Sequence, residues 1–288
     1  MDSNLVRRVG FAVVAIPLAL ALVWYGGLPL ALLLAIAGAL GARELFDLAA
    51  RADVRPVRPI GLASAAALPL LVYFAIAAPD VRAWTAEWWP YLGGLWIIVL
   101  LTWVLAVRAP TDRPLSAASI TLLAVAYTGA LPAFLLAIRH TNHPLRSWAG
   151  AWLVFFPLVV TWVCDTAAMF GGRTFGGPKL APSVSPGKTR SGSAAGVVGG
   201  LLVAPLFAAL IFPRARVDFP LWQLLLVAGV LSVVGQIGDL AESLFKREAG
   251  VKDSSNLIPG HGGVLDRFDS LYFVIPTAAA LYHAFGVI

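Results

Sequence analysis

Residues 260–270, GHGGVLDRFDS, concentrate charge and glycine in a chain that is otherwise nearly all apolar. The glycines allow backbone conformations that other residues avoid, and they let a ligand approach the chain closely. Asp266 and Asp269 offer carboxylates, the usual protein ligands for Mg²⁺ that carries substrate phosphates, and Arg267 between them matches phosphate oxygens bidentately. A glycine-rich turn with one capping aspartate would explain a single acid, but not the whole set, which also includes His261. The stretch therefore predicts a site for phosphate and metal.

A second group of polar residues lies at 235–253, where an apolar run ends. If that run continues as a helix, one face carries residues that are three or four positions apart: Gln236, Asp239, Ser243 and Lys246. An acid at the membrane surface, followed by a base, suits a metal ion and the phosphate above it. A salt-bridged helix end would show the same pattern, so both interpretations stay open at this point.

Asp165 lies near the end of another apolar run. A carboxylate at membrane depth is costly, so it is expected to have a partner and a function. The alternative is an aspartate that reaches the interface and only caps a helix.

Ser185, Lys188 and Thr189 follow in a polar turn that leads into the next apolar run. Free N–H groups at the start of a helix attract phosphate, although Pro182 stands where the Walker pattern requires glycine. The alternative for Lys188 is a positive anchor at the membrane surface. Farther on, a four-residue glycine repeat favours close helix packing rather than chemistry; it consists of Gly192, Gly196 and Gly200.

The elements that position these residues are expected to be transmembrane helices. The chain has 288 residues, of which 59% are hydrophobic and only 12% charged, with a mean hydropathy of +0.84; soluble domains carry about 25% charged residues. The sequence therefore predicts an all-α polytopic integral membrane protein with about nine transmembrane helices. The apolar runs fall at 9–25, 28–42, 60–78, 91–107, 117–138, 150–170, 194–212, 221–238 and 269–287.

The distribution of basic residues predicts the orientation. A cytoplasmic N-terminus places all but five of the 21 lysines and arginines on the cytoplasmic side, as the positive-inside rule expects. This bias explains the net charge of +6 without a nucleic-acid partner. One cysteine and four histidines argue against a disulfide framework and a structural zinc site. The five basic residues on the outer side are Arg82, Arg139, Arg146, Arg214 and Arg216.

On this topology, Asp165, Asp239 and Asp266 gather at the cytoplasmic ends of three helices, with basic residues nearby. Carboxylates that bind a divalent metal, together with basic side chains that bind a polyphosphate, are typical of enzymes of phosphoryl or nucleotidyl transfer. Residues 1–148 are predicted to form a lipid-facing scaffold of transmembrane helices, and residues 149–288 a catalytic transmembrane domain.

Residues 243–269, SLFKREAGVKDSSNLIPGHGGVLDRFD, resemble position by position the signature of the phosphatidate cytidylyltransferase (CDP-diacylglycerol synthase) family. The resemblance extends upstream to Asp165 and to residues 185–189, SPGKT, and only in general character to the first half of the chain. It implies condensation of CTP with phosphatidic acid to CDP-diacylglycerol and diphosphate, in phospholipid biosynthesis. It also implies dependence on Mg²⁺, with two divalent ions.

The resemblance further implies roles for individual residues. The metal site would consist of Asp165, Asp239 and Asp266, and the catalytic residues would be Asp239, Asp266 and Lys188. Two positions depart from the family pattern: Arg190-Ser191 replace a Trp-Glu pair, and Met169 stands where tyrosine is common. The implied substrate-binding residues are Ser185, Lys188, Thr189, Ser243, Lys246, Arg247, Lys252, His261, Arg267 and Asp269.

The implied partners are CTP, phosphatidic acid and the lipid bilayer, and a homodimer is left open. The implied location is a bacterial inner membrane, with the active site facing the cytoplasm. Three alternatives remain: a CTP-dependent polyprenol or dolichol-type lipid kinase, another CDP-lipid synthase such as the archaeal type, and an ion-coupled transporter. A transporter would hold its acids near the bilayer midplane, whereas here they lie near the ends of the apolar runs.

Overall fold

The computed structural model describes residues 3–258, 260 and 262–288, and helices dominate this part of the chain. The first half consists of α1 (Ser3–Tyr25), α2 (Gly27–Arg51), α3 (Arg58–Ala77), α4 (Pro79–Val107), η1 (Pro110–Asp112), α5 (Pro114–Ala124), the π-helical η2 (Val125–Ala130) and α6 (Leu131–His140). The second half consists of α7 (Trp148–Phe175), β1 (Lys179–Ala181), β2 (Ser185–Thr189), α8 (Arg190–Leu206), the π-helical η3 (Phe207–Ile211), α9 (Leu221–Glu248), α10 (Leu265–Phe268) and α11 (Leu271–Ala284).

Seven helices within the described residues are long and apolar enough to cross a membrane. They are α2, α3, α4, the continuous segment α5–η2–α6, α7, the segment α8–η3 and α9. The last apolar run forms α11, whose 14 residues extend about 21 Å, less than the ~30 Å of bilayer hydrocarbon. The helical membrane class is therefore confirmed, while a count of nine spans and a cytoplasmic N-terminus stay predictions.

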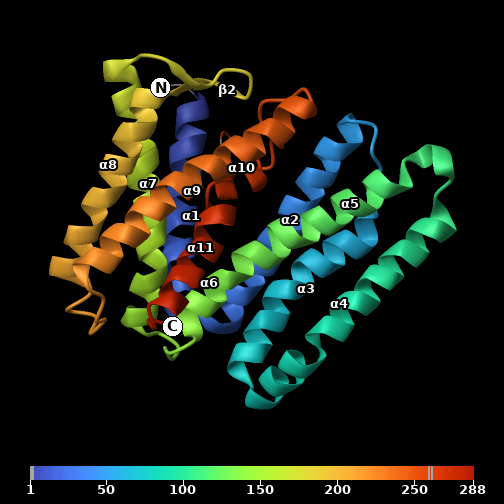
Figure 1. Cartoon of the computed structure of the whole chain (residues 1–288), viewed down its shortest axis with the longest axis horizontal. Coiled ribbons are helices and arrows are strands. Elements are labelled where there is room, and N and C mark those ends of the chain that lie inside the picture. Colours follow the sequence, from blue (N-terminus) through green and yellow to red (C-terminus); the bar gives the residue numbers. More distant parts are fainter. Residues whose placement is uncertain (1–2, 259, 261) are drawn as a thin grey trace.

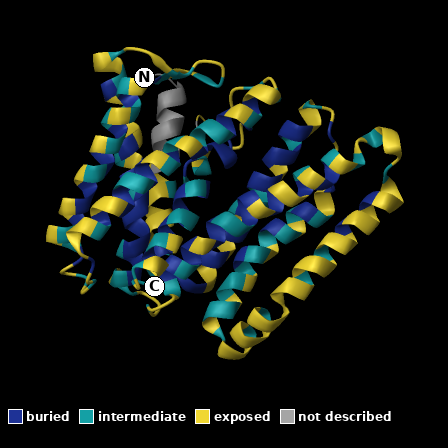
Figure 2. Ribbon diagram, viewed as in Figure 1, coloured by how far each residue is buried: buried dark blue, intermediate teal, exposed yellow. Residues whose placement is uncertain are grey.

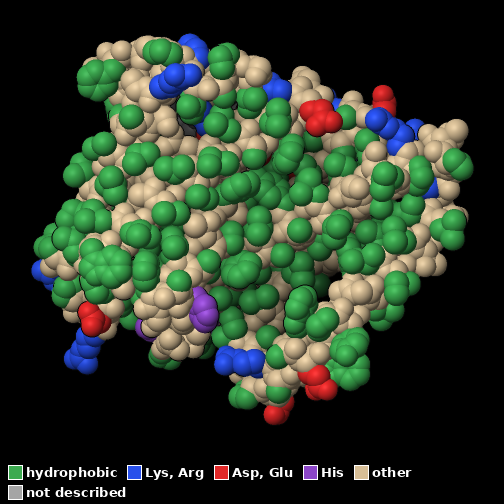
Figure 3. Space-filling view, viewed as in Figure 1, with side chains coloured by type: hydrophobic (Ala, Val, Ile, Leu, Met, Phe, Trp, Pro, Cys, Tyr) green, Lys and Arg blue, Asp and Glu red, His purple; other side chains and the backbone are tan. Residues whose placement is uncertain are grey.

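The outer surface of these helices is apolar. The helix α4 packs against α3 and α5, and it exposes large apolar side chains along most of its length (Figure 2). On the face of the molecule drawn in Figure 3, hydrophobic side chains cover the middle and charged side chains lie mostly near the two ends of the helices. This arrangement matches a hydrocarbon layer around the helices and a polar layer at each end.

One hydrophobic core joins the two halves of the chain. In Figure 1, α7, α8 and α9 lie to one side and α2 to α5 to the other, and α6 packs directly against α11 between them. The predicted scaffold and the predicted catalytic domain thus share a core, and their division of labour stays a prediction. Core side chains from both halves include Leu34, Leu136, Phe156, Leu224 and Ile275.

In the glycine repeat of α8, Gly192 and Gly196 lie against α7 and Gly200 lies against Ser232 of α9, which confirms the predicted role of the repeat in packing. A Cβ atom at Gly192 would lie 2.7 Å from the carbonyl oxygen of Ala168, and one at Gly196 would lie 3.0 Å from that of Cys164. Larger residues would force the two helices apart, so glycine permits this close approach. The approach places the start of α8 beside the half of α7 that carries Asp165.

The polar segment between α7 and α8 folds into a two-stranded antiparallel hairpin, in which Lys179 pairs with Thr189. The N–H group of Arg190 donates to the carbonyl oxygen of Pro178 at 2.9 Å, and the Ser191 hydroxyl donates to that of Gly176. Arg190 and Ser191, which depart from the family pattern, therefore tie the end of the hairpin to the residues that follow α7. The sequence predicted no strand here, because strands this short carry too little periodicity to be recognised.

Candidate active site

A cavity of about 610 Å³ opens where α7, α8 and α9 meet the hairpin. Its lining includes Asp165 from α7, Lys188 from β2 and Asp239 from α9. Three segments that are far apart in the sequence thus bring two acids and a lysine to one space. The lining also contains Arg173, Lys179, Thr189, Ser193 and Gln236.

Lys188 and Asp239 form an ion pair in this cavity. The lysine Nζ lies 2.5 Å from the aspartate Oδ2, and each side chain is 27% exposed. The other aspartate oxygen, Oδ1, accepts a hydrogen bond from the Ser243 hydroxyl at 3.3 Å. An ion pair with this much solvent access gains little stability from its attraction, so it can open at low cost when an anion binds the lysine.

Asp165 is the more available of the two cavity acids. Within the described part of the chain its carboxylate makes no ion pair and accepts no hydrogen bond from a side chain or backbone group. The helix α7 continues to Phe175, so Asp165 lies inside the helix. The alternative in which Asp165 only caps a helix is therefore wrong.

The start of α8 faces the same cavity. Thr189 caps this helix, because its hydroxyl oxygen accepts a hydrogen bond from the N–H group of Gly192 at 3.1 Å. The positive end of the helix dipole and three cations therefore act on one space, the cations being Lys188, Arg173 and Lys179. The motifs did not single out the last two residues; for Arg173 the available signal was its spacing, about two helical turns beyond Asp165.

Asp266 is not among the lining residues of the cavity and lies in a buried hydrogen-bond network. Its Oδ1 accepts a hydrogen bond from Lys246 Nζ at 2.7 Å. Its Oδ2 accepts three, from the N–H groups of Ser254 and Gly263 at 2.9 and 2.8 Å and from the Ser254 hydroxyl at 2.8 Å. Lys246 also pairs with the fully buried Glu242 at 2.5 Å. Burial raises the pKa of Asp266, but these hydrogen bonds outweigh it and hold the pKa below its usual value.

Glu44, on α2, holds the same loop from the N-terminal half of the chain. Its side chain is buried, with the residue 3% exposed. Its carboxylate accepts hydrogen bonds from the N–H groups of Val264 and Leu265 at 3.0 and 2.7 Å, and from the hydroxyls of Ser254 and Ser255 at 2.9 and 2.7 Å. Since α10 begins at these N–H groups, Glu44 caps it from a distant helix. No motif in the sequence singled out Glu44, and the available signal was an acid two residues after the apolar run that ends at residue 42.

The helix α9 continues through the second polar group, as its spacing predicted. It ends at Glu248 and carries Asp239 and Lys246 beyond the predicted end of the apolar run. The salt-bridged helix end is confirmed for Lys246, while the metal and phosphate interpretation stays a prediction for Asp239. Asp239 faces the cavity, whereas Lys246 forms the i,i+4 salt bridge of a helix end.

The remaining predicted residues have other surroundings. Arg247 donates to the carbonyl oxygens of Val184, in the turn of the hairpin, at 3.0 Å and of Val251 at 2.8 Å, so it braces the turn. Ser185 pairs with Ala181 across the hairpin. Lys252 and Arg267 are exposed. Asp269 accepts a hydrogen bond from the N–H group of Ser270 at 2.6 Å, and His261 lies outside the described residues.

The cavity fits the predicted magnesium ion in its donor chemistry. No three His, Cys, Asp or Glu side chains among the described residues gather as a complete metal site. Mg²⁺ that carries substrate phosphates needs only one or two protein carboxylates, and the cavity supplies Asp165 and Asp239. The third predicted ligand, Asp266, keeps its free acceptor capacity mainly at Oδ1, which accepts one hydrogen bond. The metal site and its ligands stay predictions.

The chain is similar to proteins of one known family along most of its length. A model of the cytidylyltransferase family matches residues 6–285. Similar proteins include phosphatidate cytidylyltransferases from Brucella suis biovar 1 (strain 1330), 52% identical over 143 residues, and from Bacillus subtilis (strain 168), 39% identical over 180 residues. A third, from Haemophilus influenzae (strain ATCC 51907 / DSM 11121 / KW20 / Rd), is 34% identical over 198 residues.

These similarities cover only part of each relative. The matched segment spans 48% of this chain and 48% of the Brucella protein, 62% and 63% for the Bacillus protein, and 68% and 66% for the Haemophilus protein. The chain thus spans about half to two thirds of the length of these curated relatives. The family model, in contrast, extends over nearly the whole sequence. The chain therefore belongs to the cytidylyltransferase family.

Proposed function

We propose that this chain transfers the cytidylyl group of CTP to phosphatidic acid, forming CDP-diacylglycerol and releasing diphosphate. The observation that carries the proposal is the meeting of Asp165, Asp239 and Lys188 in one cavity at the ends of membrane helices. Family membership supports cytidylyl transfer, and the names of the relatives supply the lipid substrate.

The reaction makes modest demands on acid–base chemistry. A phosphate oxygen of phosphatidic acid is already an anionic nucleophile when it attacks the α-phosphorus of CTP. The bond from that phosphorus to the bridging oxygen of the β-phosphate breaks, and diphosphate leaves with the bonding electron pair. The site therefore has to align the two phosphates and neutralise their charge, rather than remove a proton.

The cavity contains groups for both tasks. We assign the triphosphate to Lys188, Arg173 and Lys179 and to the N–H groups at the start of α8. When an anion binds Lys188, the lysine shares its charge between that anion and Asp239. Bound Mg²⁺ supplies charge neutralisation on the leaving diphosphate, and Asp165 and Asp239 are the residues that would hold it.

We further propose a bacterial inner-membrane location with the cavity facing the cytoplasm. The support is the bacterial origin of the relatives and the excess of basic residues on the cavity side of the predicted topology. CTP is a cytoplasmic nucleotide, so this orientation gives it direct access to the cavity. Phosphatidic acid would reach the same site from the surrounding leaflet.

Labelled CTP tests the proposed reaction directly. The purified chain is incubated with phosphatidic acid, Mg²⁺ and CTP that carries radioactive phosphorus at either the α or the γ position. Transfer of the α label to the lipid is the expected result. Transfer of the γ label instead would show a lipid kinase, and the absence of any transfer, with the protein folded, would reject the proposal.

A further inference from the structure

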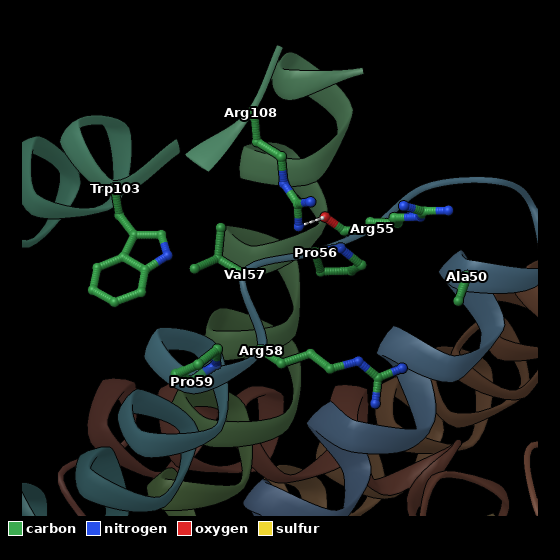
Figure 4. A pocket seen from close by; sticks show the side chains of 8 residues that line it. All are labelled: Ala50, Arg55, Pro56, Val57, Arg58, Pro59, Trp103 and Arg108. Atoms are coloured by element: carbon green, nitrogen blue, oxygen red, sulfur yellow. Dashed lines mark hydrogen bonds between the residues drawn. The ribbon is translucent and has the colours of Figure 1, made fainter. Parts of the chain in front are cut away.

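A second cavity, separate from the candidate active site, lies where α2 ends and α3 begins. Its volume is about 370 Å³, and none of its lining residues lines the active-site cavity. Three of the eight lining residues are arginines, and the lining contains no carboxylate. Figure 4 shows Trp103 and Arg108 from the α4 side, and Arg55 and Arg58 extending toward α2. The remaining lining residues are Ala50, Pro56, Val57 and Pro59.

The link that forms this cavity is held in place by neighbouring segments. Arg108 Nη2 donates to the carbonyl oxygen of Arg55 at 2.8 Å, the contact that is drawn in Figure 4. Arg113 Nη1 donates to the carbonyl oxygen of Ala52 at 3.0 Å, and the N–H group of Val57 donates to the Thr121 hydroxyl at 2.9 Å. These hydrogen bonds between side chains and backbone groups fix the shape of the cavity before any ligand arrives, which lowers the entropy cost of binding.

The cations of this cavity are only partly satisfied by the protein. Arg58 pairs with Asp47 at 2.5 Å, but both side chains are 44% exposed, so the pair competes poorly with a bound anion. The Nε of Arg108 is buried and has no hydrogen-bond partner among the described residues. A buried donor without an acceptor calls for a ligand or water to complete it.

The position of the cavity selects the class of ligand. It lies between the ends of α2 and α4 and the start of α3, which are all candidate membrane spans, and therefore at a membrane surface. Its floor of Val57, Pro59 and Trp103 is apolar, while its charged groups are guanidinium groups. Free phosphate would satisfy the arginines but leave the apolar floor uncovered. An amphipathic ligand with an anionic head satisfies both parts.

We propose that this cavity binds the headgroup of an anionic phospholipid of the bilayer. The phosphate is held by Arg108 and Arg55, and the glycerol and upper acyl region cover the apolar floor beside Trp103. Tryptophan at a membrane interface is suited to such a contact. This site is not the catalytic one and does not depend on the proposed reaction.

Binding there stabilises the folded chain, because a ligand that binds only the folded state shifts the unfolding equilibrium. The test uses the full chain in an uncharged detergent, titrated with dioleoyl phosphatidylglycerol, dioleoyl phosphatidylcholine or inorganic phosphate. Thermal unfolding is measured at each ligand concentration, and the midpoint is the concentration that gives half of the maximal rise in unfolding temperature. Native mass spectrometry gives the number of lipids bound. We expect phosphatidylglycerol to raise the unfolding temperature at far lower concentration than the other two ligands.

The Arg55→Gln/Arg108→Gln variant should require about thirtyfold more phosphatidylglycerol, since each interfacial arginine contributes about fivefold to anionic lipid attraction. The matched control is Arg82→Gln/Arg214→Gln, which removes two exposed arginines outside this cavity. A Lys188→Ala variant tests whether the lipid binds the active-site cavity instead. Both controls should keep the wild-type midpoint.

Three results would overturn the proposal. Equal stabilisation by phosphatidylcholine would show that the cavity does not select charge. Equal stabilisation by inorganic phosphate would identify a free anion as the ligand. An unchanged midpoint in the Arg55→Gln/Arg108→Gln variant, with that variant folded, would leave these arginines as topology anchors only.

Discussion

The molecule has two groups of charged residues at one end of its helices, and they differ in how their charges are satisfied. In the active-site cavity, Asp165 has no cation partner among the described residues, and the Asp239–Lys188 pair is open to solvent. In the buried network, Asp266 accepts four hydrogen bonds and Lys246 lies between two acids. The charged groups of the cavity can still bind a ligand, whereas those of the buried network use most of their hydrogen-bonding capacity within the protein.

This difference indicates separate tasks. Exposed and unsatisfied charges can bind phosphate and metal, while buried charges that lose a partner destabilise the fold. The buried network joins α2, α9 and α10 through Glu44, Lys246 and Asp266. We infer that it fixes the loop before α10, whose Ser254 and Gly263 N–H groups both donate to Asp266.

The largest expected effect is on turnover in the cavity. Replacing Asp239 by asparagine keeps the shape but removes a charge that the site needs, and should lower kcat by about a thousandfold or more. The unfolding temperature should stay near that of the wild type, since the pair with Lys188 is partly exposed to solvent. The assay is CDP-lipid formation beside thermal unfolding in detergent. Full activity in this variant would remove Asp239 from the mechanism and end the distinction between the two groups.

The next effect is on stability in the buried network. Lys246→Met leaves Glu242 and Asp266 without their cation and should lower the free energy of unfolding by about 3–5 kcal/mol. The matched control is Lys252→Met, because Lys252 is exposed and its loss should cost less than about 1 kcal/mol. Denaturant or thermal unfolding measures both variants. Equal stability of the two variants would show that the buried contacts of Lys246 with Glu242 and Asp266 do not stabilise the fold.

A third effect concerns nucleotide affinity. Lys188→Ala should raise the KM for CTP by about tenfold or more, the loss expected for one charge-assisted hydrogen bond. The KM for phosphatidic acid and the unfolding temperature should change less. Steady-state kinetics with each substrate varied in turn measures the effect. If only the lipid KM responds, the lysine binds the other substrate.

A fourth effect tests the link between the halves of the chain. In Glu44→Gln, the side-chain NH₂ group faces N–H and hydroxyl donors of the loop, which need an acceptor. The substitution should therefore lower the free energy of unfolding by about 1–3 kcal/mol. Asp47→Asn, on the same helix but exposed, is the control and should cost less than about 1 kcal/mol. A Glu44→Gln variant as stable as this control would show that the loop folds without α2.

Sequence alone predicted much of the fold because its signals are local. Long apolar runs and scarce charge identified the membrane helices, and the spacing of Asp239 and Ser243 identified the helix that continues past the apolar run. The four-residue glycine repeat predicted that α8 packs closely against other helices, which are α7 and α9. The short hairpin escaped prediction because three to five residues carry little periodic pattern.

The partners of the charged residues could not be predicted, because they depend on contacts between distant segments. Glu44 and Leu265 are separated by 221 positions, and no local pattern records such a contact. Asp239 and Asp266 have the same side chain, yet one faces a cavity and the other is buried. Residue type and spacing gave the chemistry of the site, and tertiary structure decided which groups are free to perform it.

Binding of CTP in the absence of lipid tests the central claim most directly. Titration calorimetry with Mg²⁺ present compares the wild type with the Asp165→Asn/Asp239→Asn variant, and thermal unfolding confirms that both are folded. We expect the double variant to bind CTP about a hundredfold or more weakly in the presence of Mg²⁺ while its unfolding temperature is retained. Wild-type affinity in the folded double variant would contradict the assignment of nucleotide and metal to this cavity.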